Sequence, residues 1–153
     1  MKLGDVLKKE RELKGIPLEV VAARLGISEQ QYRSLEGGTS AAEIWGPLLA
    51  QLSIKIGTQA SHLISITGRP ADVRKGACGQ LIKQRREKKQ QSLEDVARSI
   101  GISRETYEQI ESGASPIEEF GPLLLHFAAL IEQPVFNLFY PCALPLEKIE
   151  SYP

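Results

Sequence analysis

A run of basic side chains in the middle of the chain offers the clearest chemistry. Residues 69–91 carry eight basic and two acidic side chains. The basic ones are Arg69, Arg74, Lys75, Lys83, Arg85, Arg86, Lys88 and Lys89. Such a block is typical of phosphate contacts and equally typical of the solvated face of a helix. Residues 92–153 carry three basic and ten acidic side chains, so the rest of the chain supplies no strongly positive field. The charge distribution therefore does not decide between phosphate contacts and a solvated helix face.

The remaining reactive residues do not form a catalytic pattern. His62 and His126 are single histidines on largely apolar stretches, and Cys78 and Cys142 have no Cys-x-x-Cys partner and no nearby histidine. We therefore interpret the cysteines as small hydrophobic residues rather than metal ligands. The sequence contains no glycine-rich phosphate loop, paired carboxylate site or nucleophile motif. We expect a protein that is not an enzyme and that needs no metal or other cofactor.

The segments expected to position these residues form an internal sequence repeat. Residues 4–64 and 79–139 align at a constant offset of 75 without a gap, and more than a third of the aligned positions are identical. Self-similarity of this kind indicates a repeated structural unit. We predict unit 1 over residues 1–66, a linker over 67–77 that could already start the next helix, unit 2 over 78–139, and a proline-rich apolar tail over 140–153. The chain should present two equivalent surfaces.

The spacing of apolar residues predicts helices throughout, and hence an all-α fold. The predicted helices of the first copy span residues 3–14, 18–25, 29–36, 43–54 and 58–66, and those of the second span 79–89, 93–100, 104–111, 118–131 and 134–139. Ser28 and Ser103 are good caps for the third helix of each copy. Because proline breaks a helix interior, the fourth helices could instead begin at Pro47 and Pro122.

A tight turn joins the second and third helices of each copy. It combines a small residue (Ala22, Ala97), a glycine (Gly26, Gly101) and an isoleucine (Ile27, Ile102). The pattern Ala-x-x-x-Gly-Ile-Ser-x-x-x-Tyr, followed by Glu-x-Gly, resembles the phage-repressor helix-turn-helix family, also called Cro/C1 or XRE-type. The resemblance covers most of both copies. It implies two tandem five-helix repressor-like helix-turn-helix units, each with a third helix that enters the major groove of DNA.

The resemblance also implies which residues contact DNA. The base-reading residues would be Ser28, Glu29, Gln30, Arg33 and Ser34 in the first copy, and Ser103, Arg104, Glu105, Glu108 and Gln109 in the second. Glutamine can bond an adenine edge in two places, and arginine a guanine edge. The basic block would supply phosphate contacts from Arg74, Lys75, Lys83, Lys88 and Lys89. These polar residues are also compatible with an ordinary solvated helix surface.

Two further pairs of residues receive structural roles from the resemblance. Arg11 with Glu36, and Arg86 with Glu111, match an ion pair that ties the third helix to the body of the unit. Tyr32 and Tyr107 stand where the family has an aliphatic core residue. We expect each tyrosine ring to be in the core and its hydroxyl to reach solvent or a phosphate.

The chain departs from the family where DNA backbone contacts are expected. Leu18 and Leu93 replace a frequent glutamine, and the loops after the third helices lack lysine and arginine. The third helix of the second copy is acidic. Because nonspecific DNA affinity comes mainly from neutralised phosphates, we expect a weak DNA binder or one whose contacts concentrate near residues 69–89. The domain is also similar to the helix-turn-helix of a bacterial membrane-associated morphology protein, which binds a cytoskeletal protein rather than DNA.

The function that we favour is a sequence-specific, DNA-binding transcriptional regulator whose partner is double-stranded DNA. The alternative is a protein-interaction or dimerisation module, with reduced or lost DNA binding, that uses the acidic second unit and the tail. With 153 residues, no net charge and 42% hydrophobic residues, the composition is that of an ordinary globular protein. Free thiols and a charged N-terminus without a signal peptide indicate a cytoplasmic protein that does not enter the membrane.

Overall fold

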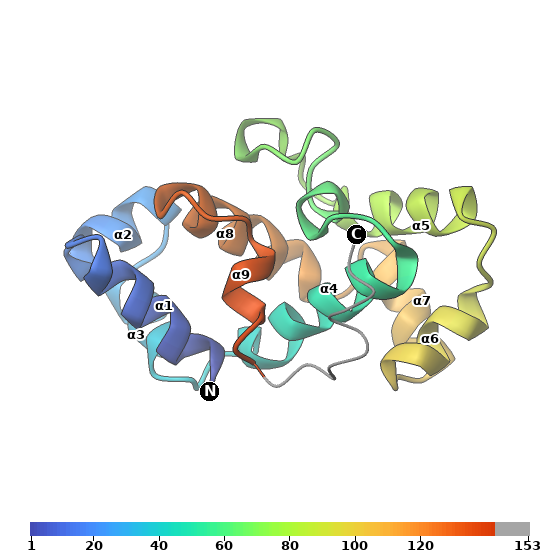
Figure 1. The fold of residues 1–153 in the computed structure, drawn as a ribbon, viewed down its shortest axis with the longest axis horizontal. Coiled ribbons are helices and arrows are strands. Elements are labelled where there is room, and N and C mark those ends of the chain that lie inside the picture. The colour runs from blue at the N-terminus through green and yellow to red at the C-terminus, as the bar shows by residue number, and fades with distance from the viewer. Residues whose placement is uncertain (143–153) are drawn as a thin grey trace.

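The computed structural model describes residues 1–142, and every regular element in this range is helical. The α-helices are α1 (Leu3–Leu13), α2 (Leu18–Leu25), α3 (Glu29–Glu36), α4 (Ala42–Ile56), α5 (Cys78–Lys88), α6 (Leu93–Ile100), α7 (Arg104–Ser112), α8 (Ile117–Leu130) and α9 (Phe136–Phe139). Two short 3₁₀ helices are η1 (Ala60–Leu63) and η2 (Pro70–Asp72). The prediction of an all-α fold is confirmed (Figure 1).

Side-chain caps start the helices that the sequence predicted best. Ser28 Oγ accepts a hydrogen bond from Gln31 N at 3.1 Å, and Gln31 Oε1 accepts one from Ser28 N at 2.9 Å, which forms a capping box on α3. Ser103 Oγ accepts from Thr106 N at 3.1 Å at the start of α7. Each cap satisfies a backbone donor that has no partner inside the helix and contributes roughly 1 kcal/mol.

Two predicted helices, and the alternative start proposed for the fourth helices, differ from the structure. The helix expected over residues 58–66 is reduced to η1, and the one expected over 134–139 is reduced to α9. The alternative start of the fourth helices at proline is wrong, because α4 and α8 contain Pro47 and Pro122 in their interiors. Upstream serines give these helices their earlier starts: Ser40 Oγ accepts from Ala42 N, and Ser115 Oγ accepts from Ile117 N.

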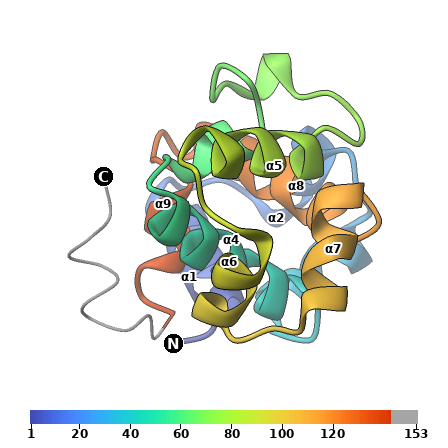
Figure 2. The ribbon, with the colours of Figure 1, turned by 90° about the vertical axis from the view of Figure 1, so that its right-hand side faces the viewer.

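The fourth helices, α4 and α8, contact both halves of the chain: α4 packs on α1 and α6, and α8 packs on α5 and α2. α2 packs on α3 within its own half but contacts α8 from the second half. In the same way, α6 packs on α7 and contacts α4 from the first half. α9 contacts α1, while η1 contacts α5, and α4 and α8 pack against each other (Figures 1 and 2). The apolar residues of both halves therefore form one hydrophobic cluster.

Two helical glycines let α4 and α8 approach their neighbours. A Cβ added at Gly46 would lie 3.0 Å from Leu3 Cδ2 and 3.0 Å from Phe139 Cε1. At the equivalent Gly121, the nearest atoms would be Cys78 Sγ and Ile64 Cγ1, both at 3.4 Å. The ring of Tyr32 also stacks on that of Phe127, with centroids 6.4 Å apart. The contacts Gly46–Phe139, Gly121–Ile64 and Tyr32–Phe127 join residues from opposite halves of the chain.

Both cysteines lie in apolar surroundings, which sets their reactivity. Burial raises the pKa of Cys78 to about 12, with a further contribution from Glu118. Burial likewise raises the pKa of Cys142 to about 11. Because a raised pKa keeps a thiol protonated, we expect both thiols of the folded protein to react with a disulfide reagent at pH 8 much more slowly than after denaturation in urea. Reaction of either cysteine at the rate of the unfolded chain would contradict this expectation.

Candidate nucleic-acid interface

The turn between α6 and α7 has the geometry of a helix-turn-helix. Gly101 ends α6 in the left-handed conformation, with φ of 76°, which glycine adopts without strain. Ala97 is buried and Ile102 packs against the core just after the turn. The α2–α3 connection repeats these features, with φ of 72° at Gly26, a buried Ala22 and a half-buried Ile27. In both places the second helix of the pair starts at a capping serine.

An arginine from α1 or α5 holds the C-terminal end of α3 or α7. Arg86 Nε and Nη2 donate to the two carboxylate oxygens of Glu111 at 2.6 and 3.0 Å. Arg11 donates to Glu36 in the same way, at 2.6 and 3.1 Å. The side chains of Arg86 and Glu111 are only 10% and 7% exposed, so each pair is shielded from water. Each buried bidentate ion pair fixes the C-terminal end of α3 or α7 against the body of the protein.

Tyr32 and Tyr107 differ from expectation in one respect. Both rings lie in the core as predicted, but both residues are fully buried, so their hydroxyls do not reach solvent or a phosphate. Burial, and next the neighbouring Glu36 or Glu111 carboxylate, raises the pKa of each phenol above its usual range. The prediction for the hydroxyls is wrong because both are enclosed in the core; the ring of Tyr32, for example, stacks on Phe127 of α8 from the other half.

A second contact that the sequence analysis missed holds the N-terminal ends of α1 and α5. Glu118 of α8 accepts hydrogen bonds from the backbone nitrogens of Cys78 and Gly79, at 3.2 and 2.8 Å. Glu43 of α4 accepts them from Leu3 and Gly4 at 2.9 and 2.8 Å. A carboxylate at a helix N-terminus satisfies unpaired donors and complements the helix dipole. The available signal was that both the glycine and the glutamate recur at the offset of 75.

The residues expected to read bases lie at the start of α3 and α7, and nine of the ten are exposed; Ser34 is partly buried. The two helices differ in how their arginines are engaged. Arg33 lies 3.8 Å from Glu29, a loose surface contact. Arg104 donates to Glu108 at 2.7 Å and also lies 2.8 Å from Glu94. Glu108, and next Glu94, raise the pKa of Arg104, and their negative charges counterbalance the guanidinium, which stays protonated. Arg33 is thus freer than Arg104 to bond a ligand.

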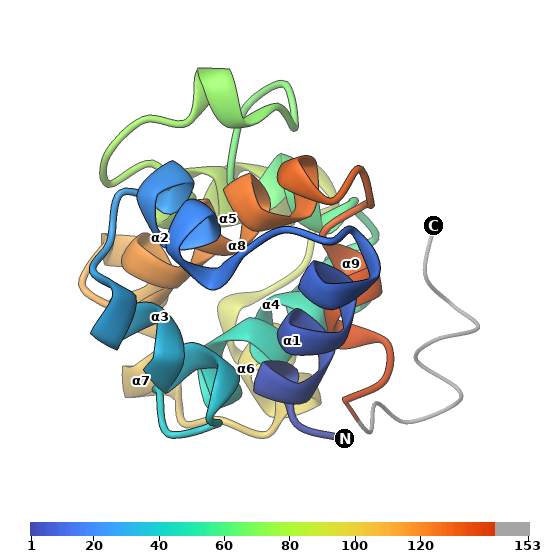
Figure 3. The same cartoon turned by 90° about the vertical axis from the view of Figure 1, so that its left-hand side faces the viewer.

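α3 and α7 lie on the same side of the molecule. Figure 3 shows both helices on the left, while α1 and α9 lie on the right. In Figure 1 the same two helices lie at opposite ends of the long axis. The two short polar helices therefore lie on a common side of the molecule, well separated along its long axis.

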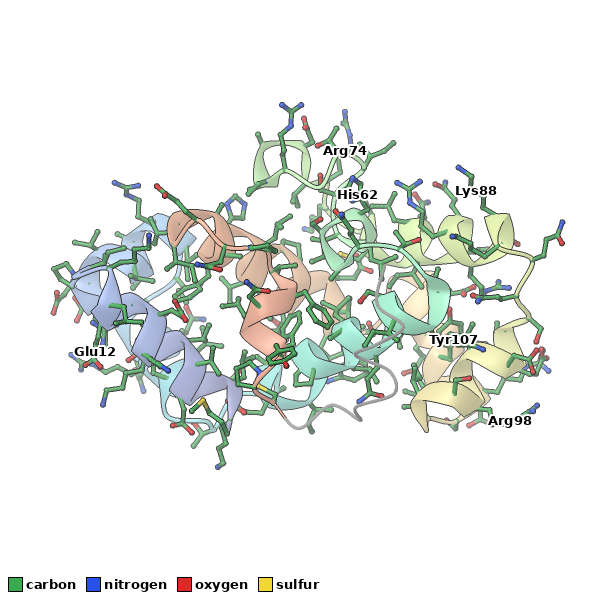
Figure 4. All side chains as sticks on the ribbon, viewed as in Figure 1. Glu12, His62, Arg74, Lys88, Arg98 and Tyr107 are labelled. Atoms are coloured by element: carbon green, nitrogen blue, oxygen red, sulfur yellow. The ribbon has the colours of Figure 1, made fainter. Side chains whose placement is uncertain are left out.

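The residues expected to contact phosphates form a different surface. Arg74, Lys75, Lys83, Lys88 and Lys89 are all exposed. Figure 4 shows Arg74 and Lys88 along the upper edge of the molecule with His62 between them, whereas Arg98 of α6 points away at the lower edge. The basic surface therefore follows η2 and α5 rather than surrounding α7.

The described residues contain no cluster of three or more histidine, cysteine, aspartate or glutamate side chains that could hold a metal ion. In the same range, no helix is long and apolar enough to cross a membrane.

Comparison with known proteins identifies the class of domain. Residues 77–120 match a family model described as a helix-turn-helix domain. This segment contains α5, α6 and α7, with Gly101 at the turn. The second half of the chain is thus similar to a helix-turn-helix domain from α5 to α7 and into the start of α8. No curated protein and no solved structure matches the chain significantly.

Proposed function

We propose that this chain is a sequence-specific, DNA-binding transcriptional regulator of the Cro/C1 or XRE type, acting in the cytoplasm. In this proposal two tandem helix-turn-helix units of one chain take the place of the two subunits of a dimeric repressor. The observation that carries the proposal is the exposure of α3 and α7 toward one side of the molecule, each tied down by a buried arginine–glutamate pair. Dimeric repressors likewise use two recognition helices, one for each of two half-sites about one helical turn apart.

The charges on the two reading helices give the proposed units unequal roles. α3 has Gln30, Arg33 and Glu29 at its exposed start, and Arg33 has only a distant ion-pair partner. α7 has Glu105 and Glu108 there, and its arginine is held by two carboxylates. Because carboxylates repel the DNA backbone, α3 would supply most of the base contacts, and α7 would contribute few.

Selection from a pool of random duplexes tests the proposal directly. The full chain would be incubated with random-sequence duplexes, and the bound fraction sequenced after several rounds at two salt concentrations. We expect one enriched half-site, read by α3, with a weaker preference about one helical turn away, read by α7. No enrichment at either salt concentration would refute sequence-specific binding.

Single substitutions on α3 and α7 separate the two reading helices. We expect Arg33→Ala to weaken binding to the selected duplex by about 1–3 kcal/mol, since a bidentate base contact is lost. Arg104→Ala should cost less, because Arg104 must leave Glu94 and Glu108 before it can reach a base. Both side chains are exposed, so the melting temperature should stay close to that of the wild type. Equal affinity of the Arg33 variant and the wild type would exclude groove reading by α3.

The acidic surface of α6 and α7 favours a second candidate, a protein-interaction or dimerisation module. Glu94, Asp95, Glu105 and Glu108 outnumber Arg98 and Arg104 on these helices. Such a surface suits a basic protein partner better than DNA. The tail was also expected to contribute to this interaction, but residues 143–153 lie outside the described residues. Under this candidate, deleting residues 140–153 abolishes self-association or partner capture, measured by light scattering and pull-down, and no duplex is enriched.

A further inference from the structure

A basic groove lies where η1 meets the C-terminal end of α5. It has a volume of about 430 Å³ and is lined by His62, Arg85, Lys88 and Lys89 together with residues 57–59. No acidic side chain lines it. Arg85 Nε is buried and has no hydrogen-bond partner within the described part of the chain. The groove thus brings together the cationic side chains of Arg85, Lys88 and Lys89. The Nε–H donor of Arg85 is shielded from water and has no acceptor among the described residues.

The groove is separate from the proposed base-reading surface. Arg86 points from α5 to Glu111 of α7, whereas the next residue back, Arg85, lines the groove beside η1. Successive residues of an α-helix point about 100° apart around its axis, so Arg85 and Arg86 lie on different sides of α5. Figure 2 shows α5 above α6, beneath the loop that carries η2, with α7 to its lower right, and Figure 4 shows His62 and Lys88 toward the upper edge.

The fold itself does not require this concentration of charge. At the offset of 75, Glu10 corresponds to Arg85, Leu13 to Lys88 and Lys14 to Lys89. Cations do stabilise helix C-termini, but a neutral or acidic residue stands at two of these three positions in the equivalent helix, α1. Since both helices end in the same way, stability does not explain three cations converging on one groove.

We propose that this groove binds a phosphate group, contributed either by the backbone of duplex DNA or by a free phosphorylated small molecule such as a nucleotide. Arg85 offers a planar donor set suited to phosphate oxygens, and the two lysines supply point charges around it. The Thr58 hydroxyl and the Gln59 side-chain amide, also at the groove, can donate further hydrogen bonds. The site does not depend on base reading by α3 or α7.

The test compares two variants that each lose three positive charges. The groove variant is Arg85→Gln/Lys88→Gln/Lys89→Gln, and the matched control is Lys8→Gln/Lys9→Gln/Lys14→Gln on α1, whose lysines are also exposed. Binding of a 30-base-pair duplex of random sequence and of ADP would be measured by fluorescence anisotropy and calorimetry, at several salt concentrations. Because Arg85 is half-buried, the variant Lys88→Gln/Lys89→Gln serves as a second test if the triple variant unfolds.

We expect the groove variant to lose about tenfold or more in affinity for the probe that the wild type binds, while the control keeps wild-type affinity for ADP and most of its affinity for DNA. If the duplex is the ligand, a plot of log K against log salt has a negative slope. The magnitude of this slope should decrease by about 2–3 more in the groove variant than in the control variant. Binding of ADP alone would identify a free phosphorylated molecule as the source. The proposal is overturned if the wild type binds neither probe, or if groove and control variants bind alike. Arg33→Ala should leave ADP binding unchanged, which separates a failure of this proposal from a failure of base reading.

Discussion

Replacing Glu111 with alanine is expected to lower the free energy of unfolding by about 3–5 kcal/mol. The change leaves the Arg86 guanidinium in a site where its side chain is 10% exposed, with Nε and Nη2 deprived of their acceptors. Its remaining partner is the Gln91 carbonyl, at 2.7 Å. Since a buried charge without its counter-charge is strongly unfavourable, the effect should appear as a lower urea midpoint with an unchanged slope.

Two variants serve as controls for this experiment. Glu94→Ala removes a carboxylate that pairs with Arg104 on the surface, and we expect a loss below about 1 kcal/mol. The double substitution Arg86→Met/Glu111→Leu removes both charges and should recover most of the lost stability. If Glu111→Ala costs no more than Glu94→Ala, the pair is not the anchor that its geometry indicates.

Gly79→Ala is expected to destabilise the protein by about 1–3 kcal/mol, toward the upper end of that range. A Cβ at this position would lie 2.3 Å from the Ile110 carbonyl oxygen and 2.8 Å from that of Glu111. Both obstacles are backbone atoms of α7, so the clash cannot be relieved by rotating a side chain. The substitution should push α7 away from α5 and weaken the Arg86–Glu111 pair. Thermal unfolding followed by circular dichroism measures the loss.

Gly121→Ala is the matched control, because this glycine is also helical. The nearest atoms to an added Cβ at Gly121 are side-chain atoms at 3.4 to 3.6 Å, an ordinary contact. Alanine is favoured over glycine in a helix by about 1 kcal/mol, so we expect this variant to be as stable as the wild type or slightly more stable. A Gly79→Ala variant that behaves like Gly121→Ala would show that α7 has room to move.

The sequence predicted the helices better than it predicted their partners. The capped and glycine-terminated helices α2, α3, α6 and α7 lie within a residue of their predicted bounds, because local signals define them. The packing of α4 on α6, and of α8 on α2, could not be predicted. These contacts join segments far apart in the sequence, and the internal repeat does not show which copy of a helix a given neighbour contacts. η1, at Ala60–Leu63, is shorter than the predicted helix over residues 58–66.

The candidate site was predictable where a single sequence motif contained all of its residues. The exposed residues of α3 and α7 follow from the helix-turn-helix pattern, and whether they touch DNA stays a prediction. The basic groove was not predictable, since His62 and Arg85 belong to elements separated by η2 and its flanking turns. The engagement of Arg104 by Glu94 was also hidden, because it joins two helices across the turn.

The contacts between the two halves have a consequence for the order in which these helices can fold. The core contacts of α1, α2 and α3 include α8 and α9, which come at least 80 residues after α3 ends. Domains usually fold as they leave the ribosome, at roughly 5–20 residues per second. Here the core around α2 and α3 is complete only after α8 has been synthesised. We therefore expect the segment from α1 to α3 to stay accessible to chaperones and proteases until α8 has emerged from the ribosome.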